Sequence, residues 1–91
     1  MRIRWTPAAA SDLPTIHDYL SEHEPRLARP TAIALREDTL SLRKFPHRGR
    51  PGTVEGTREL LHERLAYIVV YRVKEDAVEI LHIWHPSQHR G

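Results

Sequence analysis

The chain has 91 residues, of which 40% are hydrophobic and 29% are charged, and its formal net charge is +2. This composition excludes a disordered tail, and the length predicts one domain over residues 1–91. Cysteine is absent, which excludes disulfides and thiolate metal sites. No stretch is apolar enough to cross a bilayer or to form a signal region, so we expect a cytoplasmic protein without a membrane partner.

Charge is distributed unevenly along the chain. Residues 39–54 contain no acid but four Lys or Arg residues, among them Arg48 and Arg50, and residues 80–91 also contain no acid. The folded domain should therefore have a basic pole. Such a pole attracts either an acidic protein segment or a phosphate backbone, and composition does not choose between them.

The first elements are a short strand and a helix. Arg2–Trp5 alternates polar and apolar residues, as a strand does, and Thr6-Pro7 reads as an N-cap followed by proline in the first turn. We expect the helix to end near His23, with a kink or a later start caused by Pro14. Its apolar stripe consists of Ala9, Leu13, Ile16 and Leu20.

A second helical segment opens at Pro25. Pro30 disturbs its first turns, so we expect the regular helix to begin near Thr31, and Phe45-Pro46 ends it. The two helices should form an antiparallel hairpin. The loop that follows, of roughly ten residues, is long for a small domain and is therefore a candidate functional element. The expected buried face of the second helix carries Ala28, Ala32, Leu35 and Leu42, interrupted by Thr39.

Three strands are predicted next, over residues 58–64, 66–74 and 77–84. The short polar turn at residues 74–77 makes the last two strands antiparallel neighbours. Both faces of Tyr67–Val73 are largely apolar, which indicates a central strand covered on each side, one side by the helical hairpin. The predicted fold class is α+β: a strand, a helical hairpin packed on one face of the sheet, and a three-stranded antiparallel run.

Several motifs occur along this order of elements. They are Trp5-Thr6-Pro7-Ala8-Ala9, Asp12-Leu13, Ile16-His17-Asp18-Tyr19-Leu20, Phe45-Pro46, Gly49-Arg50, Arg58-Glu59-Leu60, Tyr67-Ile68-Val69, Tyr71-Arg72-Val73, Ile80-Leu81 and His85. Taken together and in order, they resemble the RelE/ParE family of bacterial type II toxins over nearly the whole chain.

The resemblance implies one of two activities. RelE-like members are ribosome-dependent ribonucleases that cut mRNA, whereas ParE-like members poison DNA gyrase and lack that activity. Both are held inactive by a cognate antitoxin whose flexible C-terminal part wraps the toxin, and operator DNA is reached only through the antitoxin. No cofactor is implied for either branch.

Departures from the RelE pattern favour the ParE branch. RelE-like toxins place an arginine directly after the aromatic residue that corresponds to Tyr67, and this chain has Ile68 there. Glu59 and Leu61 stand where lysines are expected, and Pro86-Ser87-Gln88-His89-Arg90 lacks the tyrosine of the RelE C-terminus. Because these changes remove most of the groups that stabilise phosphate charge, we expect a gyrase inhibitor that acts by binding and has no catalytic residues.

Two other functions stay open. The first is a ribosome-dependent mRNA endoribonuclease in which His85 acts as the acid, together with Arg58, Arg72 and Glu59, because imidazole titrates near neutral pH. The second is a degenerate toxin that only binds its antitoxin. For a binding toxin, the residues expected to contact the target or the antitoxin are Arg48, Arg50, Arg58, Arg72, Trp84, His85, Gln88 and Arg90.

Structural roles compete with these assignments. We expect Arg58 and Glu59 to pair across strands, and Arg72 to form an ion pair with Glu59 or Glu79. Trp5 should belong to the core, and Trp84 to the core or an interface. No metal site is expected, because His82 and His85 would point to opposite faces of a strand.

The antitoxin should be recognised by both shape and charge. We expect an amphipathic helix or an extended segment that lies across exposed apolar surface, with acidic residues that meet Arg48 and Arg50.

Overall fold

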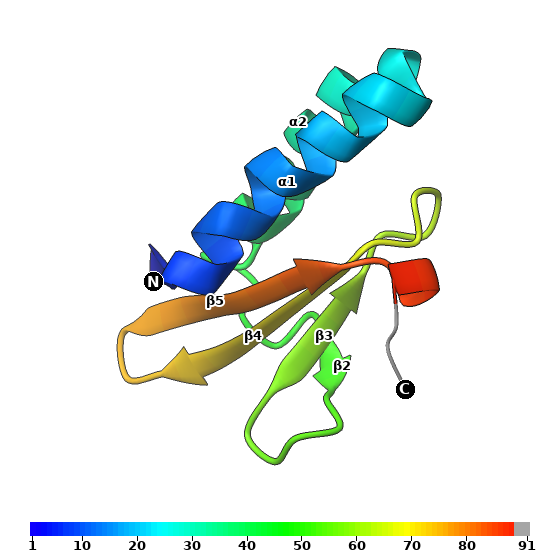
Figure 1. Ribbon diagram of the computed structural model, residues 1–91. Helices are drawn as coiled ribbons and strands as arrows, with labels where there is room; N and C mark the ends of the chain where they lie inside the picture. Colours follow the sequence, from blue (N-terminus) through cyan, green and yellow to red (C-terminus); the bar gives the residue numbers. More distant parts are fainter. Residues whose placement is uncertain (89–91) are drawn as a thin grey trace.

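The computed structural model describes residues 1–88 and contains a five-stranded sheet. Figure 1 shows that a helical hairpin covers one face of this sheet. The strand order is β1-β5-β4-β3-β2. This confirms the predicted α+β class with the helices on one face of the sheet. The elements are β1 (Arg2–Trp5), α1 (Pro7–His23), α2 (Pro25–Ser41), β2 (Arg50–Pro51), β3 (Arg58–Leu61), β4 (Ile68–Lys74), β5 (Ala77–Trp84) and the 3₁₀ turn η1 (Pro86–Gln88).

The sheet is mixed. β3, β4 and β5 form the predicted antiparallel run, but β1 pairs in parallel with β5, from Arg2 opposite Ala77 to Trp5 opposite Ile80. The predicted loop also contains a strand, because β2 pairs with the start of β3. Two residues are too short to show a strand pattern, which is why sequence reasoning assigned them to the loop.

Helix α1 follows the prediction at both ends. The Thr6 side chain accepts a hydrogen bond from the backbone N–H of Ala9, and the helix ends at His23. Of the two effects expected from Pro14, the delayed start is wrong, since the helix is continuous from Pro7. Pro14 is exposed and removes only one backbone hydrogen bond, while the apolar stripe of α1 is buried around it.

Helix α2 begins six residues earlier than predicted, at Pro25. Pro30 lies in its second turn and does not break it. Ala28 and Thr31, on either side of Pro30, are both buried, so the helix packs against the rest of the molecule through this region. Tertiary burial therefore outweighs the lost backbone hydrogen bond.

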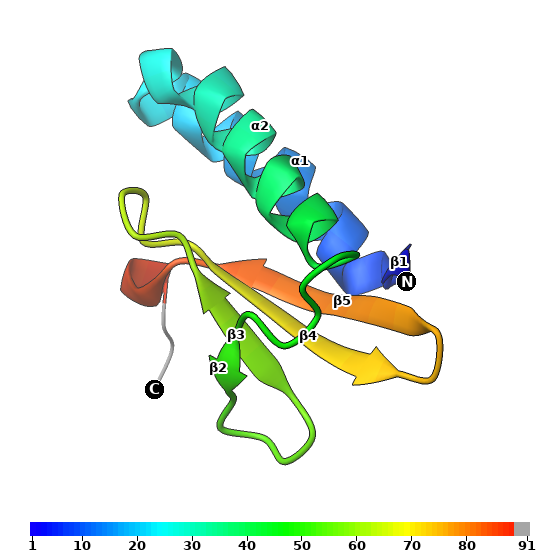
Figure 2. The same cartoon turned by 180° about the vertical axis from the view of Figure 1, so that it is seen from behind.

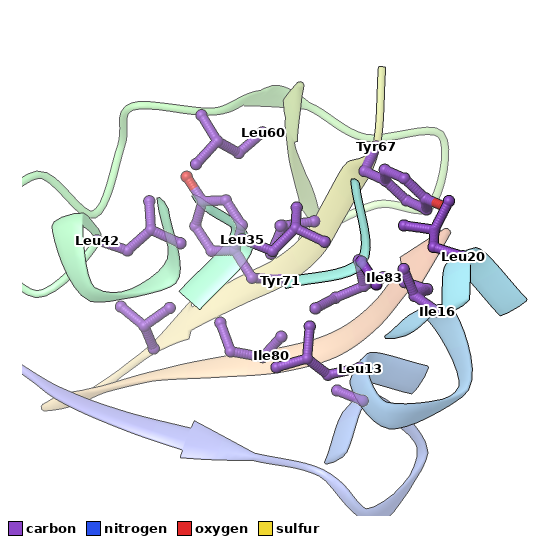
Figure 3. Packing of buried hydrophobic residues seen from close by; sticks show 14 residues of the cluster. Leu13, Ile16, Leu20, Leu35, Leu42, Leu60, Tyr67, Tyr71, Ile80 and Ile83 are labelled. Carbon is purple, nitrogen blue, oxygen red and sulfur yellow. The ribbon is translucent and has the colours of Figure 1, made fainter. Parts of the chain in front are cut away.

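The core lies between the hairpin and the sheet, as Figure 3 shows. Tyr71 on the central strand β4 is completely buried, and so are Leu35 within α2, Leu42 just after α2 and Ile80 on β5. Trp5 packs against this cluster and is partly buried, so it belongs to the margin of the core.

One side chain fastens α1 to the edge of β5. The Asp12 carboxylate accepts a hydrogen bond from the backbone N–H of Ile83 at 2.9 Å and lies 3.2 Å from Nδ1 of His82. β1 pairs with β5 only as far as Ile80, so Asp12 satisfies an amide beyond the end of that pairing. The end of β5 is thereby positioned against the hairpin.

β3 ends earlier than predicted, and β4 starts later, because residues 62–67 form a tight turn. The Ala66 N–H donates to the His62 carbonyl at 2.7 Å, and the His62 N–H donates to the Tyr67 carbonyl at 2.9 Å. Nδ1 of His62 also accepts the N–H of Leu65. Ala66 has a φ of 63°, which is unusual for a residue with a β-carbon. Figure 2 shows this turn from behind, on the side of the sheet that carries the hairpin.

Candidate partner-binding site

An apolar groove opens where the far end of the helical hairpin meets the 62–67 turn and the end of β5. Its volume is about 280 Å³. Tyr19 and Leu27 on the helices are 52% and 42% exposed, which is high for large apolar side chains beside a groove. The lining residues are Tyr19, Leu20, Leu27, Thr31, Leu65, Tyr67, His85 and Ser87.

Tyr67 and His85 form the floor of this groove on the sheet side. Their rings meet edge to face, with 5.0 Å between centroids and an interplanar angle of 75°. Nδ1 of His85 accepts the backbone N–H of Ser87 at 3.0 Å, so the neutral ring carries its proton on Nε2. Burial raises the pKa of the Tyr67 hydroxyl, which stays protonated at neutral pH. The groove thus combines an apolar wall with a polar rim.

Arg72 lies on the sheet face away from the hairpin, in a three-residue charge network. Glu79 receives hydrogen bonds from Arg72 Nε and Arg4 Nη1, each at 2.7 Å. The Arg72 guanidinium, followed by that of Arg4, holds the pKa of the Glu79 carboxyl below its ordinary value despite burial. The predicted ion pair between Arg72 and Glu79 is confirmed, and it gives Arg72 a structural partner.

Arg58 lies on the other face of the sheet, because it is paired with the buried Tyr71. Its guanidinium donates to the Gly49 carbonyl at 2.7 Å and to the His47 carbonyl at 3.4 Å. The predicted cross-strand pairing is therefore wrong for Arg58, which binds backbone carbonyls of the preceding loop. It is confirmed for Glu59, which lies opposite Arg50 on β2 and contacts it at 3.3 Å.

The residues considered for RNA cleavage are not brought together. Arg58 is turned towards the 47–49 segment, whereas Arg72 is bound to Glu79 on the opposite face of the sheet. Glu59 is paired with Arg50, and His85 lies beyond β5 in the groove with Tyr67. The sheet itself thus separates two of the cations that such a mechanism would need near one phosphate.

The remaining candidate residues lie in different places. Arg48 is exposed and donates to the Ser41 hydroxyl at 2.7 Å, and the Arg50 side chain is 64% exposed. Trp84 is partly buried and stands opposite the buried Ile68. Gln88 is the last residue of η1, and Arg90 lies outside the described residues.

Sequence reasoning missed two groups of residues. The first is the exposed apolar side of the groove, Tyr19 and Leu27, although the position of Tyr19 off the α1 stripe was a signal. The second is the link between Tyr71 and the preceding loop: its hydroxyl accepts the Gly49 N–H and donates to the Pro46 carbonyl, each at 2.8 Å. A buried tyrosine requires such partners, so this residue type was the available signal.

The described residues contain neither a metal-binding cluster nor a membrane-spanning helix. Within residues 1–88, no cluster of three or more His, Asp or Glu side chains is arranged to hold a metal ion. His82 and His85, considered as possible ligands, lie apart beside Asp12 and Tyr67, respectively. In the same part of the chain, no helix has the length and apolar character needed to span a membrane.

Comparison with known proteins gives consistent matches over almost the entire chain. The model of the family described as "ParE toxin of type II toxin-antitoxin system, parDE" matches residues 3–90. "Putative toxin Y4kP" of Sinorhizobium fredii is 37% identical over 87 residues, covering 96% of this chain and 90% of its own. "Toxin RelE2" of Caulobacter vibrioides is 33% identical over 87 residues, covering 96% and 97%.

A solved structure agrees with these matches. A chain of the structure described as "Chromosomal ParDE TA system from P. aeruginosa" superposes with a TM-score of 0.84 at 32% identity, and the match covers 93% of this chain and 95% of that one. The sequence and the fold thus point to the same group of proteins. The chain belongs to the ParE toxin family of type II toxin–antitoxin systems.

Proposed function

We propose that this toxin is ParE-like in action: it inhibits DNA gyrase by binding it, in the bacterial cytoplasm, and a cognate antitoxin neutralises it. The observation that carries the proposal is the placement of Arg58 and Arg72 on opposite faces of the sheet, each tied to a structural partner. Ile68, which stands in place of the RelE-type arginine, is buried and adds no phosphate-binding group. A binding toxin needs no such group.

The antitoxin would occupy the groove between the hairpin and the 62–67 turn. This groove offers exposed apolar side chains, and an amphipathic helix or strand buries such surface well. The exposed guanidiniums of Arg48 and Arg50 would meet acidic residues from a part of the antitoxin outside the groove, as charge complementarity favours, because Arg48 binds the Ser41 hydroxyl at the other end of α2.

The gyrase proposal is tested by a DNA-cleavage assay. Purified toxin is titrated onto supercoiled plasmid with gyrase and ATP, and protein-linked linear DNA should accumulate. Toxin saturated with its antitoxin is the control and should leave the plasmid supercoiled. Normal supercoiling at a large excess of free toxin would contradict the proposal and direct attention to mRNA cleavage in ribosome-containing extracts.

The groove proposal is tested separately by antitoxin affinity. Tyr19→Glu and Leu27→Glu place a charge on surface that the antitoxin would bury, and both side chains are exposed enough for the fold to tolerate the change. Each should weaken binding by about 10- to 100-fold, since losing one large apolar contact costs about 1.5–3 kcal/mol. Val54→Glu, at a 66% exposed apolar residue outside the groove, is the matched control. Equal affinities for all three variants would refute the assignment.

A further inference from the structure

A second apolar surface lies at the opposite end of α2 from the groove. Leu40 is 50% exposed, Met1 43% and Phe45 59%. Met1 and Leu40, with Arg43 and Lys44, line an open hollow of about 380 Å³. We call Met1, Leu40, Arg43, Lys44 and Phe45 the C-terminal patch of α2. Large apolar side chains that gather at one place on a surface mark a site of contact with another molecule.

The charge of this patch is entirely basic. Arg43 and Lys44 stand beside the hollow, and no acid occurs in residues 39–54. Among the described residues, Lys44 has no side-chain hydrogen bond or ion pair, and the Arg43 side chain makes only a 3.4 Å hydrogen bond to the Met1 carbonyl. Cations after a helix also offset its dipole, so their presence alone would mark no site. The combination of these cations with three exposed apolar side chains does mark a binding site.

The patch and the groove are separate surfaces. Leu27 in the groove and Leu40 in the patch lie 13 positions apart on α2, which corresponds to about 20 Å along the helix axis at about 1.5 Å per residue. A ligand seated in the groove therefore leaves the patch open unless it extends along the whole helix. The two surfaces can serve different partners.

We propose that the C-terminal patch of α2 docks the protein on which the toxin acts, through an acidic segment of that target with apolar side chains. Arg43 and Lys44 pair with the acids, while Leu40 and Phe45 provide the apolar anchors that a protein interface needs at its centre. A nucleic acid backbone would use the two cations but not the aliphatic side chains, so the apolar content favours a protein. This inference depends on the proposed function in one respect: the toxin must act on a protein.

The test compares two patch variants with one control in the full chain. Arg43→Glu/Lys44→Glu reverses the charge, and Leu40→Ser/Phe45→Ser removes the exposed apolar anchors. Arg29→Glu/Lys74→Glu makes the same charge change at exposed positions away from the patch, since Arg29 lies about three helical turns from Leu40. Each protein is assayed for growth arrest on induction, for co-purification with the co-expressed antitoxin, and for binding to purified gyrase.

Both patch variants should lose growth arrest and bind gyrase at least 10-fold more weakly, while antitoxin co-purification and the control variant stay as in the wild type. Charge reversal should also remove most of the salt dependence of gyrase binding. Full growth arrest by both patch variants would overturn the proposal whatever the target is.

Other outcomes separate the two proposals. If the wild type arrests growth but does not bind gyrase, only the assignment of gyrase as the target is wrong. Growth arrest by the patch variants then still shows whether the patch binds the target. A wild-type chain that arrests no growth overturns both proposals. Binding of the wild type to bare DNA, lost with the charge reversal but kept with Leu40→Ser/Phe45→Ser, would replace the protein target with nucleic acid.

Discussion

The Tyr71 hydroxyl and the Gly49 amide are joined by a 2.8 Å hydrogen bond in the interior of the molecule. The same hydroxyl donates to the Pro46 carbonyl, and burial raises its pKa, so it remains a donor at neutral pH. The central strand β4 therefore fixes the position of the basic 46–50 segment through the Tyr71 hydroxyl. Arg58 holds the same segment from β3 through the Gly49 carbonyl.

Tyr71→Phe should lower the free energy of unfolding by about 1–3 kcal/mol, because the Gly49 amide loses its buried partner. Urea denaturation monitored by circular dichroism measures this. Tyr19→Phe, which removes an exposed hydroxyl, is the control and should change stability little. Equal stability of Tyr71→Phe and the control would contradict this prediction. It would mean that water or another acceptor binds the Gly49 N–H when the hydroxyl is removed.

Gly49→Ala should also destabilise the fold, through overpacking. A β-carbon at residue 49 would lie 2.8 Å from the Tyr71 hydroxyl and 2.9 Å from the backbone oxygen of Glu59. We expect a loss of about 1–3 kcal/mol in urea denaturation. Combining it with Tyr71→Phe should not restore stability, because the Glu59 carbonyl stays in place. A double variant as stable as Tyr71→Phe alone would show that the loop shifts freely.

Ala66→Gly should raise stability. Ala66 has a φ of 63°, a conformation that costs a residue with a β-carbon about 1–2 kcal/mol and glycine almost nothing. The larger chain entropy of glycine in the unfolded state offsets part of this gain, leaving up to about 1 kcal/mol. Thermal unfolding should show a higher midpoint. Ala34→Gly, in the middle of α2, is the opposite control and should lower it.

Glu79 should make stability depend on acid pH. Hydrogen bonding from Arg72 and Arg4 lowers the pKa of its carboxyl in the folded state below the ordinary value of 4.5. The group therefore stabilises the fold above pH 4.5, and this contribution disappears as the pH falls through the folded pKa. Glu79→Gln should lose stability relative to the wild type at pH 7, and the difference should shrink as the pH falls below 4.5. Urea midpoints measured over this pH range test this; a constant difference would contradict it.

His85→Ala distinguishes the binding function from the ribonuclease alternative. If His85 were a general acid, its removal would abolish growth arrest and transcript cleavage together. A binding toxin should keep arresting growth, whereas antitoxin affinity should fall because His85 lines the groove. The assay pairs induced growth curves with antitoxin binding, and complete loss of toxicity in a folded variant would favour the ribonuclease.

Hydrophobic patterning in the sequence predicted α1, β4 and β5. The helix was placed from its apolar stripe and the two strands from their apolar runs, all to within two residues. β2 and the parallel pairing of β1 with β5 could not be predicted, since each depends on which distant segments meet. Pro30 misled the prediction for α2 because packing of Ala28 and Thr31 outweighs a single missing hydrogen bond.

The candidate site was harder to predict than the fold. Arg72 pairs with Glu79, one of its two expected partners, because an arginine within an apolar strand needs a carboxylate. Arg58 binds the Gly49 carbonyl instead of pairing across strands, because its register opposite Tyr71 is not visible in the sequence. The groove depends on how the hairpin, the 62–67 turn and the end of β5 converge, which no single segment encodes.

The parallel pairing of β1 with β5 affects how the protein is made. Arg2 lies opposite Ala77, so the first strand synthesised stays without its neighbour until the last strand is available. Contacts between such distant parts of a chain form late and slow folding, because the long intervening segment must be closed first. The sheet of a nascent chain therefore stays incomplete until β5 has been synthesised.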